Sequence, residues 1–535
     1  MTTALSRLSF GSASREDNVR LEGALGFAGL LLAWQLAIAC GFSGHGTIAS
    51  PMQILRQFFV VDGPGFYFNS AASTLHAAAQ GWCWGVLLAC VFGVLLILMP
   101  VLEAPVMLLG TVSYCLPMVA IGPVLVIVAS EETPRVTLAA LAVFFPMLVG
   151  VHLGLRSANK TVLDVIHAFG GGNVTQMMKV RWRAALPQFF ASLRVSAPSA
   201  LLGAIIGEFL GAESGLGVVL INSQQALNYP RTWTLVVFSA VLASAAYALI
   251  RFVGAWVTPW ARETHSNLAA STVERGSTRS TRVKTILIAL AKMALSFLLV
   301  LAVWWLLLKA FNVPNFIGKG PADVWAYLFD PDSGADNRSA LASESLTTLR
   351  DAGLGLFCGT VAALVAAGLF EIFPVLGRML IAPALSLQSV PLVAITPLIV
   401  LVFGRQLETI AIIGSSITFF PMLVNITQAL ARTPKESTDL MRVFGASEGM
   451  TLLKVRIPYA LPAVFASLRI AAPLSITGAL LAEWLATGNG LGYSVMTDVA
   501  TSDYDGVWTR VALATFYSLL LYNGVGLVER WLNSR

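Results

Sequence analysis

The sequence has 535 residues, of which 56% are hydrophobic and 12% are charged, and its formal net charge is +6. Soluble domains carry about 25% charged residues, so this composition excludes an ordinary soluble protein. Several apolar runs reach the roughly 20 residues that a helix needs to span a bilayer, and we therefore predict an all-α integral membrane protein.

The apolar runs fall into two sets of six predicted membrane spans. The first set lies at residues 21–41, 79–99, 104–129, 134–155, 187–211 and 231–258. The second set lies at residues 286–310, 350–372, 376–403, 406–430, 462–486 and 507–531. Residues 259–285 are rich in Ser, Thr and Arg, which is typical of a flexible linker. We therefore predict a first repeat at residues 1–258, a linker at 259–285 and a second repeat at 286–535.

The two sets of spans are copies of one another. Residues 187–217 and 462–492 are identical at 15 of 31 positions without a gap. A proline-flanked apolar motif at residues 117–123 also returns at residues 391–397. Because each copy holds an even number of spans, both copies have the same orientation in the membrane. They are predicted to be parallel repeats related by an axis along the membrane normal.

The distribution of Lys and Arg predicts the orientation of the chain. If the N-terminus, the linker, the loops before the fifth spans and the C-terminus are cytoplasmic, most of the 34 Lys and Arg residues lie on that side. The loops on the other side carry acidic residues instead, namely Asp62, Glu131, Glu132, Asp323, Asp330, Asp332, Asp336, Asp498, Asp503 and Asp505. We therefore predict a multi-pass protein with both termini inside.

A short amphipathic helix is predicted in the polar loop before each fifth span. In the second half, residues 433–436 have the pattern of a capping box with proline at the first helical position. Leu440, Val443 and Phe444 form an apolar stripe, and Gly445 is typical of the residue that ends a helix. One such helix would be explained as an interfacial anchor. Its presence at the same place in both repeats favours docking to a two-fold partner.

These residues resemble the EAA loop of permeases from binding-protein-dependent ABC importers. In that loop an acidic residue is followed by a glycine six positions later and a proline thirteen positions beyond the glycine; here they are Asp439, Gly445 and Pro458. The surrounding F-G-A-S, K-V-R-I-P-Y-A-L-P and A-E-W-L sequences are most similar to the nitrate/sulfonate/taurine branch. The resemblance covers both halves. It implies a type I importer (MetI-like) fold with two tandem six-helix repeats, about 12 transmembrane helices, in one fused chain.

The resemblance also implies partners. A coupling helix in each half would dock to a dimer of cytoplasmic ABC ATPase subunits, through Asp164, Gly170, Lys179, Asp439, Phe444, Gly445, Lys454 and Pro458. An extracytoplasmic binding protein would deliver a small-molecule substrate, and the chain would lie in the bacterial inner membrane. No nucleic-acid partner is expected.

The two loops depart from the family pattern in different ways. Both carry Asp, at Asp164 and Asp439, where the family usually has Glu. The first loop has three glycines after its helix, Arg183 where Pro458 stands in the second loop, and a weaker capping pattern at Thr161. We therefore expect an asymmetric pair of docking helices, of which the second is closer to the family pattern and has a proline hinge.

No nucleotide, metal or catalytic site is predicted in the chain itself. A G-x-x-x-x-G-K-[ST] phosphate-binding loop is absent, so ATP would be hydrolysed by the partner subunit and no cofactor is expected here. The glycines around Gly355 open an apolar span with no strand before them, which favours close packing of membrane helices over a dinucleotide site. The five cysteines show no CxxC spacing, and the five histidines are scattered.

Glu208 and Glu483 occupy equivalent positions late in the fifth spans. A charge near the middle of a membrane costs on the order of 3 kcal/mol, and such a residue normally faces a cavity or a partner. Each glutamate either lines the pathway or accepts hydrogen bonds from the glycine loop that follows, at residues 215–217 and 490–492. Both alternatives place the pair near an external gate.

Arg194 and Arg469 also correspond to each other, near the inner ends of the same spans. They either attract an anionic solute or, as the pattern favours, extend to the cytoplasmic lipid headgroups. Pro117 and Pro391 interrupt the third spans, which is tolerated only where neighbours or a cavity satisfy the freed backbone groups. Spans 3 and 5 of each half are therefore predicted to line the pathway.

The substrate implied by the resemblance is a small anion such as a sulfonate, taurine or nitrate, and then a pyrimidine-type vitamin precursor or an aromatic acid. Three other classes of protein remain as alternatives. A secondary transporter with two parallel six-helix repeats would need buried ion sites, for which only Glu208 and Glu483 are candidates. A membrane-bound enzyme would need clustered polar residues, and a channel would conduct without ATP.

Overall fold

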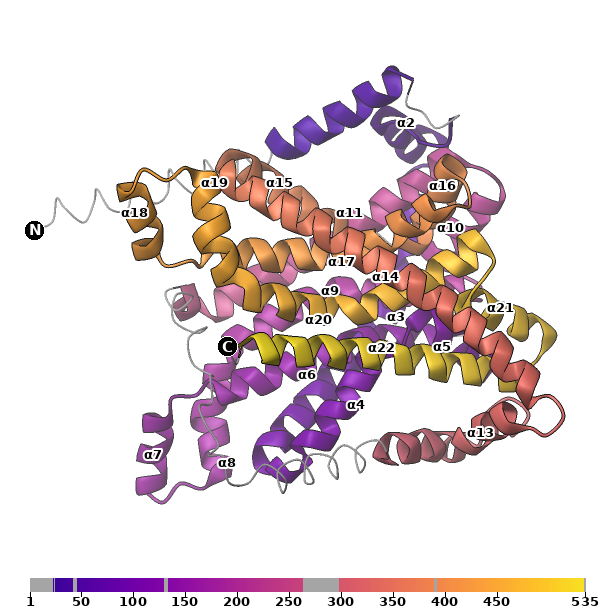
Figure 1. The fold of residues 1–535 in the computed structure, drawn as a ribbon, viewed down its shortest axis with the longest axis horizontal. Helices are drawn as coiled ribbons and strands as arrows, with labels where there is room; N and C mark the ends of the chain where they lie inside the picture. Colours follow the sequence, from indigo (N-terminus) through magenta and orange to yellow (C-terminus); the bar gives the residue numbers. More distant parts are fainter. Residues whose placement is uncertain are drawn as a thin grey trace, which may run out of the picture.

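The structure is a computed structural model that describes Gly23 and residues 25–41, 46–128, 133–262, 298–388 and 392–533. Every regular element in these ranges is a helix, and most of the long helices run along one common direction (Figure 1). The predicted linker at 259–285 and Pro391 lie largely or wholly outside the described residues. The all-α membrane fold predicted from composition is confirmed.

The first half begins with the helix Leu25–Ala39. It continues with α2 (Pro51–Arg56), η2 (Gln57–Val61), α3 (Pro64–Leu98), η3 (Pro100–Leu102), α4 (Glu103–Cys115), α5 (Met118–Val128), α6 (Thr133–Arg156), α7 (Lys160–Ala168), α8 (Asn173–Gln176), η4 (Met177–Arg181), α9 (Trp182–Phe209), α10 (Leu216–Gln225), α11 (Tyr229–Val257) and η5 (Pro259–Arg262). Of these, η2 and η4 are single π-helical turns.

The second half begins, within the described residues, with the helix Leu298–Ala310. It continues with α13 (Pro321–Phe329), α14 (Gly334–Ile372), α15 (Pro374–Gln388), α16 (Leu392–Phe403), α17 (Leu407–Ala431), α18 (Lys435–Val443), α19 (Glu448–Thr451), η7 (Leu452–Arg456), α20 (Ile457–Ala482), η8 (Glu483–Thr487), α21 (Leu491–Thr501) and α22 (Tyr504–Asn533). The order of elements repeats that of the first half, as the duplicated sequence predicts.

Eight helices in the described ranges are long and apolar enough to cross a membrane, and a ninth span forms if a bent pair is counted as one. They correspond to predicted spans 2, 4, 5 and 6 of each half. The bent pair is predicted span 3 of the first half, where α4 and α5 meet at 93°. The first helix of each half is apolar but has fewer than 18 described residues. Predicted span 376–403 is covered by α15 and α16, each shorter than 18 residues, with residues outside the described ranges between them. The described spans therefore number fewer than the twelve predicted.

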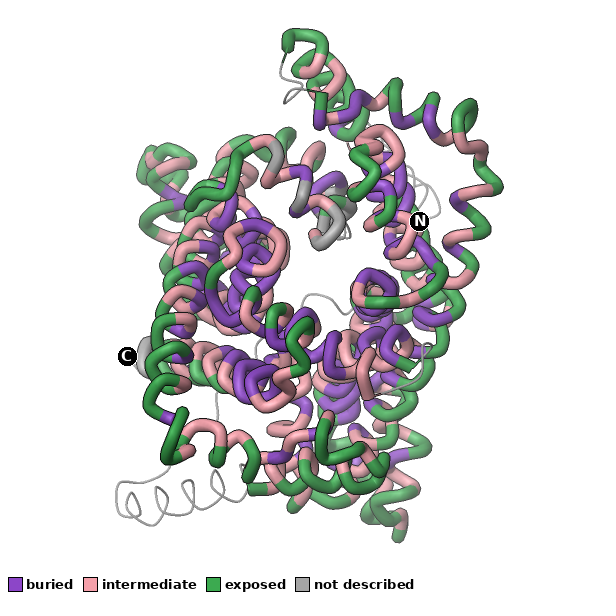
Figure 2. Tube along the Cα trace, turned by 90° about the vertical axis from the view of Figure 1, so that its right-hand side faces the viewer, coloured by how far each residue is buried: buried purple, intermediate pink, exposed green. Residues whose placement is uncertain are grey.

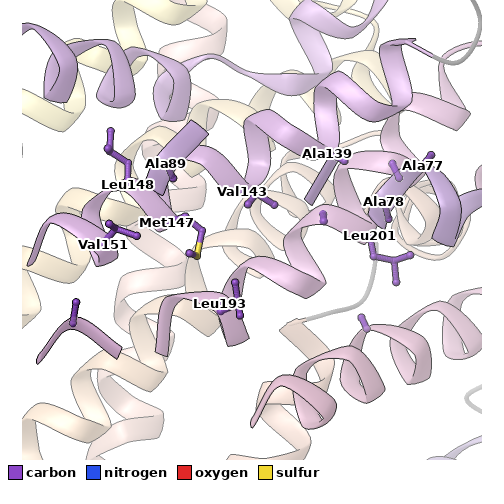
Figure 3. Packing of buried hydrophobic residues seen from close by; sticks show 14 of the residues in the cluster. Ala77, Ala78, Ala89, Ala139, Val143, Met147, Leu148, Val151, Leu193 and Leu201 are labelled. Carbon is purple, nitrogen blue, oxygen red and sulfur yellow. The ribbon is translucent and has the colours of Figure 1, made fainter. Parts of the chain in front are cut away.

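Each half has its own core of small and branched side chains. In the first half, α3, α6 and α9 enclose Val143, Met147 and Leu193 (Figure 3). The helices approach closely because glycines lie at the crossings. A Cβ atom on Gly81 would lie 2.6 Å from the Val136 carbonyl oxygen. In the second half, a Cβ on Gly355 would lie 2.7 Å from the Cα atom of Gly414, which confirms the predicted packing role of these glycines.

The two halves are joined by shared apolar clusters. One cluster brings Phe209 and Leu220 of the first half together with Ile413 and Leu481 of the second. The rings of Phe209 and Trp484 meet edge to face, with centroids 5.8 Å apart. A second cluster packs α5 against α20, α21 and α22. Figure 2 shows the buried positions gathered inside the bundle, with exposed positions around it.

The two ends of the bundle hold different elements. Figure 1 places α7, α8, α18 and α19 at one end, which we call the α7/α18 end. The opposite end holds α10 and α21 and the glycine loops, residues 215–217 and 490–492, and we call it the glycine-loop end. The fifth-span helices, α9 and α20, run from the first end to the second and so connect both sets of predicted site residues.

Candidate coupling segments and buried carboxylates

The two short helices at the α7/α18 end expose apolar side chains. Helices α7 and α18 have nine residues each. Phe169 is 88% exposed at the end of α7, and Val443 and Phe444 are 83% and 77% exposed at the end of α18. Isolated exposed apolar residues need no explanation, but a matched pair of apolar helix tips at one end of a molecule is typical of a protein-binding surface.

Both helices begin differently from the sequence-based prediction. The capping box at residues 433–436 is wrong, because Pro434 is the N-cap residue and no side chain caps the helix. The Thr433 hydroxyl donates instead to the carbonyl oxygen of Leu430, at 2.9 Å. In the first half the cap is Asn159, whose side chain accepts from the Thr161 amide at 2.9 Å. The first helix is therefore the better capped of the two.

Both helices end as predicted, at a glycine in the left-handed conformation. Gly170 has φ +79° and Gly445 has φ +70°. Their amides donate to the carbonyl oxygens of His167 and Arg442, each at 2.9 Å. This turn satisfies carbonyl groups left free at a helix end, and glycine adopts it without a steric penalty.

A π-helical turn joins each short segment to its membrane helix. These turns, η4 and η7, occupy the same place in the two repeats. From η4, Arg181 donates to the Leu155 carbonyl oxygen at the end of α6, at 3.1 Å. From η7, Arg456 forms an ion pair with Glu371 at the end of α14. Each turn is thus tied to a neighbouring membrane helix.

The sequence predicts a proline hinge in the second half and none in the first. The backbones of the two halves do not differ in this way. Helical structure is continuous over Asn173–Phe209 and over Glu448–Thr487. Pro458 is the second residue of α20, directly after the π turn η7, and the helix continues through it without a break. Its counterpart Arg183 also lies in a continuous helix. The remaining predicted coupling residues, Asp164, Lys179, Asp439 and Lys454, are all exposed.

At the glycine-loop end, Glu208 is fully buried and bound to the glycine loop. Its Oε2 atom accepts hydrogen bonds from the Gly217 amide and the Thr74 hydroxyl, both at 2.9 Å. The Thr74 oxygen in turn accepts from the Leu216 amide at 2.8 Å. Arg135 of α6 brings its Nη1 atom to 3.9 Å from Glu208 Oε1. These contacts fasten the start of α10 to the end of α9.

Glu483 makes the same backbone contacts in the second half. Its Oε2 atom accepts from the Gly492 amide at 2.7 Å, and the Thr348 hydroxyl is hydrogen-bonded to the carboxylate. The Leu491 amide donates to the Thr348 oxygen at 3.1 Å. Of the two alternatives predicted for the glutamates, both copies therefore have the contacts of the second, in which the carboxylate holds the glycine loop.

The glycine loops need glycine for steric reasons. A Cβ atom on Gly215 or Gly490 would come within 2.2 or 2.3 Å of the carboxyl carbon of the nearby glutamate. Both residues also have positive φ, at +127° and +99°. The loop can close over the carboxylate only because these positions carry no side chain.

The predicted arginines and prolines lie apart from these glutamates. Arg469 stacks on the ring of Tyr522, 4.3 Å from its centroid, and its Nη1 atom is 3.8 Å from Glu529 Oε2. Both partners belong to α22, so this guanidinium is engaged within the bundle. Arg194 donates to the Phe190 carbonyl oxygen at 3.3 Å. Pro117 lies at the break between α4 and α5, where a helix cannot continue undisturbed.

Each half also has a charged clamp at the glycine-loop end that sequence reasoning did not find. In the first half, Arg231 of α11 pairs with Asp62 before α3. Tyr67 and Gln57 donate to the same carboxylate at 2.7 and 2.8 Å. Burial opposes the ionisation of Asp62, but these hydrogen bonds outweigh it and hold its pKa below the usual value.

The clamp of the second half uses other positions. Arg510 of α22 donates to Glu344 of α14 at 2.8 and 3.0 Å and to Asp498 of α21 at 2.5 Å. Despite this contact, burial raises the pKa of Asp498 to about 7, with further repulsion from Asp503 and Glu344. One arginine therefore serves more carboxylates than it can neutralise.

The residues that the prediction missed were visible as charges inside predicted spans. Arg135 falls in predicted span 134–155 and Asp351 in predicted span 350–372. A charge in such a place is a functional candidate by itself. Asp351 is 1% exposed, and its carboxylate accepts from the Arg350 side chain at 2.9 and 3.0 Å.

The described residues contain no group of three or more His, Cys, Asp or Glu side chains that could hold a metal ion. A small apolar crevice lies between α14, α17 and α20, lined by Leu364, Gly368, Ile426, Leu430, Ile457, Ala460 and Val464. Its lining has no polar side chain to orient a solute, so we interpret it as loose packing between three helices.

Comparison with known protein families identifies the same duplication. The model of the family described as "binding-protein-dependent transport system inner membrane component" matches residues 83–263 and again residues 355–535. The two matches cover the fifth spans and the short helices of both halves.

Individual relatives match a part of the chain. A "probable ABC transporter permease protein" of Haemophilus influenzae is 30% identical over 222 residues, which are 42% of this chain and 88% of that protein. A riboflavin transport system permease of Chloroflexus aurantiacus is 37% identical over 28% of this chain and 57% of its own length. A nitrate import permease of Synechococcus elongatus is 28% identical over 39% of this chain and 76% of its own.

Proposed function

We propose that this chain, which belongs to the family of binding-protein-dependent transport system inner membrane components, forms a complete translocation pathway from its two halves. The observation that carries the proposal is the repeated path from α7 or α18, through a π-helical turn, along α9 or α20, to a buried glutamate. An importer needs two such paths, and this chain contains both.

At the α7/α18 end, the apolar helix tips would dock in clefts of two cytoplasmic ATPase subunits. Movement of the ATPases would shift α7 and α18, and the tied π turns would pass the shift to α9 and α20. Asp164, Lys179, Asp439 and Lys454 would surround the contact with charge, which favours correct docking more than affinity. This assignment requires both termini to be cytoplasmic, in agreement with the Lys and Arg distribution.

At the glycine-loop end, an extracytoplasmic binding protein would deliver the solute. Glu208 and Glu483 would keep α10 and α21 fixed to the membrane helices, on both sides of the point where the solute leaves the binding protein. The pathway would run between the halves, along spans 3 and 5, where Pro117 interrupts the first and Pro391 is its sequence counterpart. We place Arg194 and Arg469 inside the bundle rather than at the solute.

For the substrate we propose a small anion of the sulfonate, taurine or nitrate class. The similarity to a permease named for nitrate import supports this class. A permease named for formylaminopyrimidine transport is also similar, which supports a pyrimidine-type vitamin precursor as the second candidate, beside an aromatic acid. The net positive charge of the chain agrees with an anionic solute but does not select one.

A secondary transporter is the alternative function. It would use Glu208 and Glu483 as ion sites, which does not explain why both carboxylates hold the amides of the glycine loops. It also gives no reason for two matched apolar helix tips. Uptake by the purified chain without any ATPase would establish this alternative.

The decisive experiment truncates the helix tips. The variants Phe169→Ala and Phe444→Ala, singly and together, are co-expressed with an ABC ATPase that co-purifies with the wild-type chain. Each is expected to weaken co-purification about tenfold, which corresponds to roughly 1.4 kcal/mol. Val101→Ala is the matched control, because Val101 is 89% exposed but lies outside α7 and α18.

Uptake is then measured in proteoliposomes with ATP, the binding protein and a panel of anions. The double variant should lose ATP-dependent uptake, and the control should keep it. Replacing Gly445 with Val should also impair both association and uptake. If these variants left association and uptake intact, the coupling role of α7 and α18 would be wrong.

A further inference from the structure

The two buried glutamates have the same backbone partners but opposite electrostatic surroundings. Glu208 and Glu483 are 1% and 0% exposed, so neither is stabilised by bulk water. Each accepts from a glycine-loop amide and a threonine hydroxyl. The difference lies in two further positions, one on the second span and one on the fourth, where the halves carry residues of different charge.

In the first half these positions supply a cation. Arg135 on α6 is 3% exposed and lies 3.9 Å from Glu208. The other position, three residues after Thr74 on α3, is Ala77. The buried carboxylate and the buried guanidinium balance each other, with no formal charge left over.

In the second half the same positions supply an anion. The counterpart of Arg135, at an offset of 275 residues, is the buried Ile410. The counterpart of Ala77, at an offset of 274, is Asp351. Asp351 lies three residues after Thr348 on α14, and therefore on the same helix face as the hydroxyl that is hydrogen-bonded to Glu483. Its cation is Arg350, whose side chain is 60% exposed.

Two buried oxygen atoms of this second site have no hydrogen-bond partner among the described residues. They are Glu483 Oε1 and Asp351 Oδ2. A buried polar atom without a partner is costly, and a second carboxylate beside an ionised one is more costly still. A single proton removes one charge and converts an unsatisfied acceptor into a donor.

We infer that the pair Glu483 and Asp351 is a proton-binding site, which occupies in the second half the place that the Glu208–Arg135 ion pair occupies in the first. The proton is bound by the pair, as in other coupled carboxyl groups, and is held while the site is closed to water. The site exists only in the second half, because the first half has no second acidic residue at the equivalent position.

The other elements around Glu483 provide no alternative neutralising charge. Within the described residues α16 has no ionisable group, and α17 has Arg405 just before it and Glu408 at its start, both exposed. On α14, Glu344 is engaged with Arg510 of α22. On α21, Asp498 is engaged with the same arginine.

The proton links this site to pH. In the arrangement seen here the site is closed and holds the proton. If α14, α20 and α21 separate, water reaches the carboxyl groups and the proton is released. The closed arrangement then binds more protons than the open one, so a rise in pH favours opening at the glycine-loop end. The inference of a proton site does not depend on the proposed function. The effect of this site on solute entry does rest on the proposed function.

The test is infrared spectroscopy of the purified full-length chain in lipid nanodiscs. A protonated carboxyl group has a C=O stretching band that a carboxylate lacks, and the band shifts in D₂O. Wild type minus Glu483→Gln, and wild type minus Asp351→Asn, are recorded at neutral pH. At least one difference spectrum should contain a lost protonated-carboxyl band. Glu208→Gln is the matched control and should remove only carboxylate signal.

Each outcome of the infrared measurement either supports or overturns the proton site. A protonated band lost in Glu483→Gln, in Asp351→Asn or in both supports the site. No lost band in either variant overturns it, because both groups are then ionised. Correct folding is checked by gel filtration and thermal unfolding, where Glu483→Gln should melt within a few degrees of wild type. Glu208→Gln should melt earlier, because it leaves Arg135 without its anion.

The role in opening has its own measurement. A spin label on the variant Thr497→Cys, made in a chain whose exposed Cys40 and Cys83 are replaced by Ser, reports separation of the glycine-loop end, because Thr497 of α21 is exposed. Wild type should open more as pH rises, and Glu483→Gln should lose this pH dependence. A pH dependence that persists in the variant overturns the link. Failure of uptake with an intact infrared band would instead count against the proposed transport function alone.

Discussion

The two ends of the molecule preserve the duplication in different ways. At the α7/α18 end the two copies differ in sequence, with Pro458 against Arg183 and different helix caps, yet the helices, glycine turns and π turns agree. At the glycine-loop end the copies agree in Glu208 and Glu483, yet the charges around them are reversed. At the α7/α18 end, the backbone geometry of the two copies is the same although their sequences differ. At the glycine-loop end, the backbone contacts are the same although the charges near the glutamates differ.

The physical reason is that backbone geometry and the balance of buried charge depend on different positions. Helix ends and glycine turns are set by local backbone preference and by packing, which many side chains satisfy. The balance of a buried charge depends on one or two side chains contributed by other helices. A duplicated chain can therefore change a charge partner with two substitutions and leave the fold unaltered.

The largest expected effect comes from giving the first half the residue of the second. Arg135→Ile leaves Glu208 without its buried cation and should lower the free energy of unfolding by about 3–5 kcal/mol. The double variant Arg135→Ile/Glu208→Gln should recover most of the loss. Thermal unfolding in detergent measures both, with Ile410→Val as a control that removes one methylene group. An unchanged melting temperature in the single variant would contradict the ion-pair role.

The next largest effect is the loss of stability when a glycine of the glycine loops is replaced, and it should be equal in the two halves. A Cβ on Gly217 would lie 2.6 Å from the Ile205 carbonyl oxygen, and one on Gly492 would lie 2.3 Å from that of Leu480. Gly217→Ala and Gly492→Ala should each cost about 1–3 kcal/mol of unfolding free energy, because backbone atoms must move. Gly449→Ala is the control, since no atom lies near its Cβ. A large difference between the halves would disprove the shared backbone.

The two charged clamps should respond to pH in opposite directions. Asp498 has a raised pKa of about 7, so its contribution to stability is complete below its usual pKa of 3.8 and is lost as pH rises toward 7. Asp62 has a lowered pKa, so its contribution is present above 3.8 and is lost as pH falls below that value. The free energy of unfolding, measured from pH 2 to 8, should show a slope of at most about 1.4 kcal/mol per pH unit on the neutral side that Asp498→Asn removes. Persistence of the slope in that variant would refute the assignment.

The smallest effect is expected at the helix ends. Gly170→Val and Gly445→Val place a side chain in the left-handed region, which costs roughly 1–2 kcal/mol each. No atom lies within 4 Å of either Cβ, so the strain stays local. Hydrogen exchange of the amides in α7 and α18 should rise by similar factors in the two variants. A response confined to one variant would show that the two docking segments are not equivalent.

Much of the architecture followed from the sequence alone. The duplication, the membrane class and the glycines that end α7 and α18 were predicted, because apolar periodicity and left-handed glycines are local signals. The helix starts were not predicted at Thr433 and Thr161, since the capping residue lies one or two positions away and several polar residues compete for it. The break at Pro117 was visible, but its 93° angle was not.

The charges around the glutamates were decided by tertiary structure. Glu208 is 73 residues from Arg135, and Glu483 is 132 residues from Asp351. Sequence by itself determined that two glutamates lie inside membrane spans and that each precedes a glycine loop. Only the packing of α6 with α9 and of α14 with α20 decides which charge meets which carboxylate. Such a contact depends on the crossing of separate helices, and no local pattern in the chain records it.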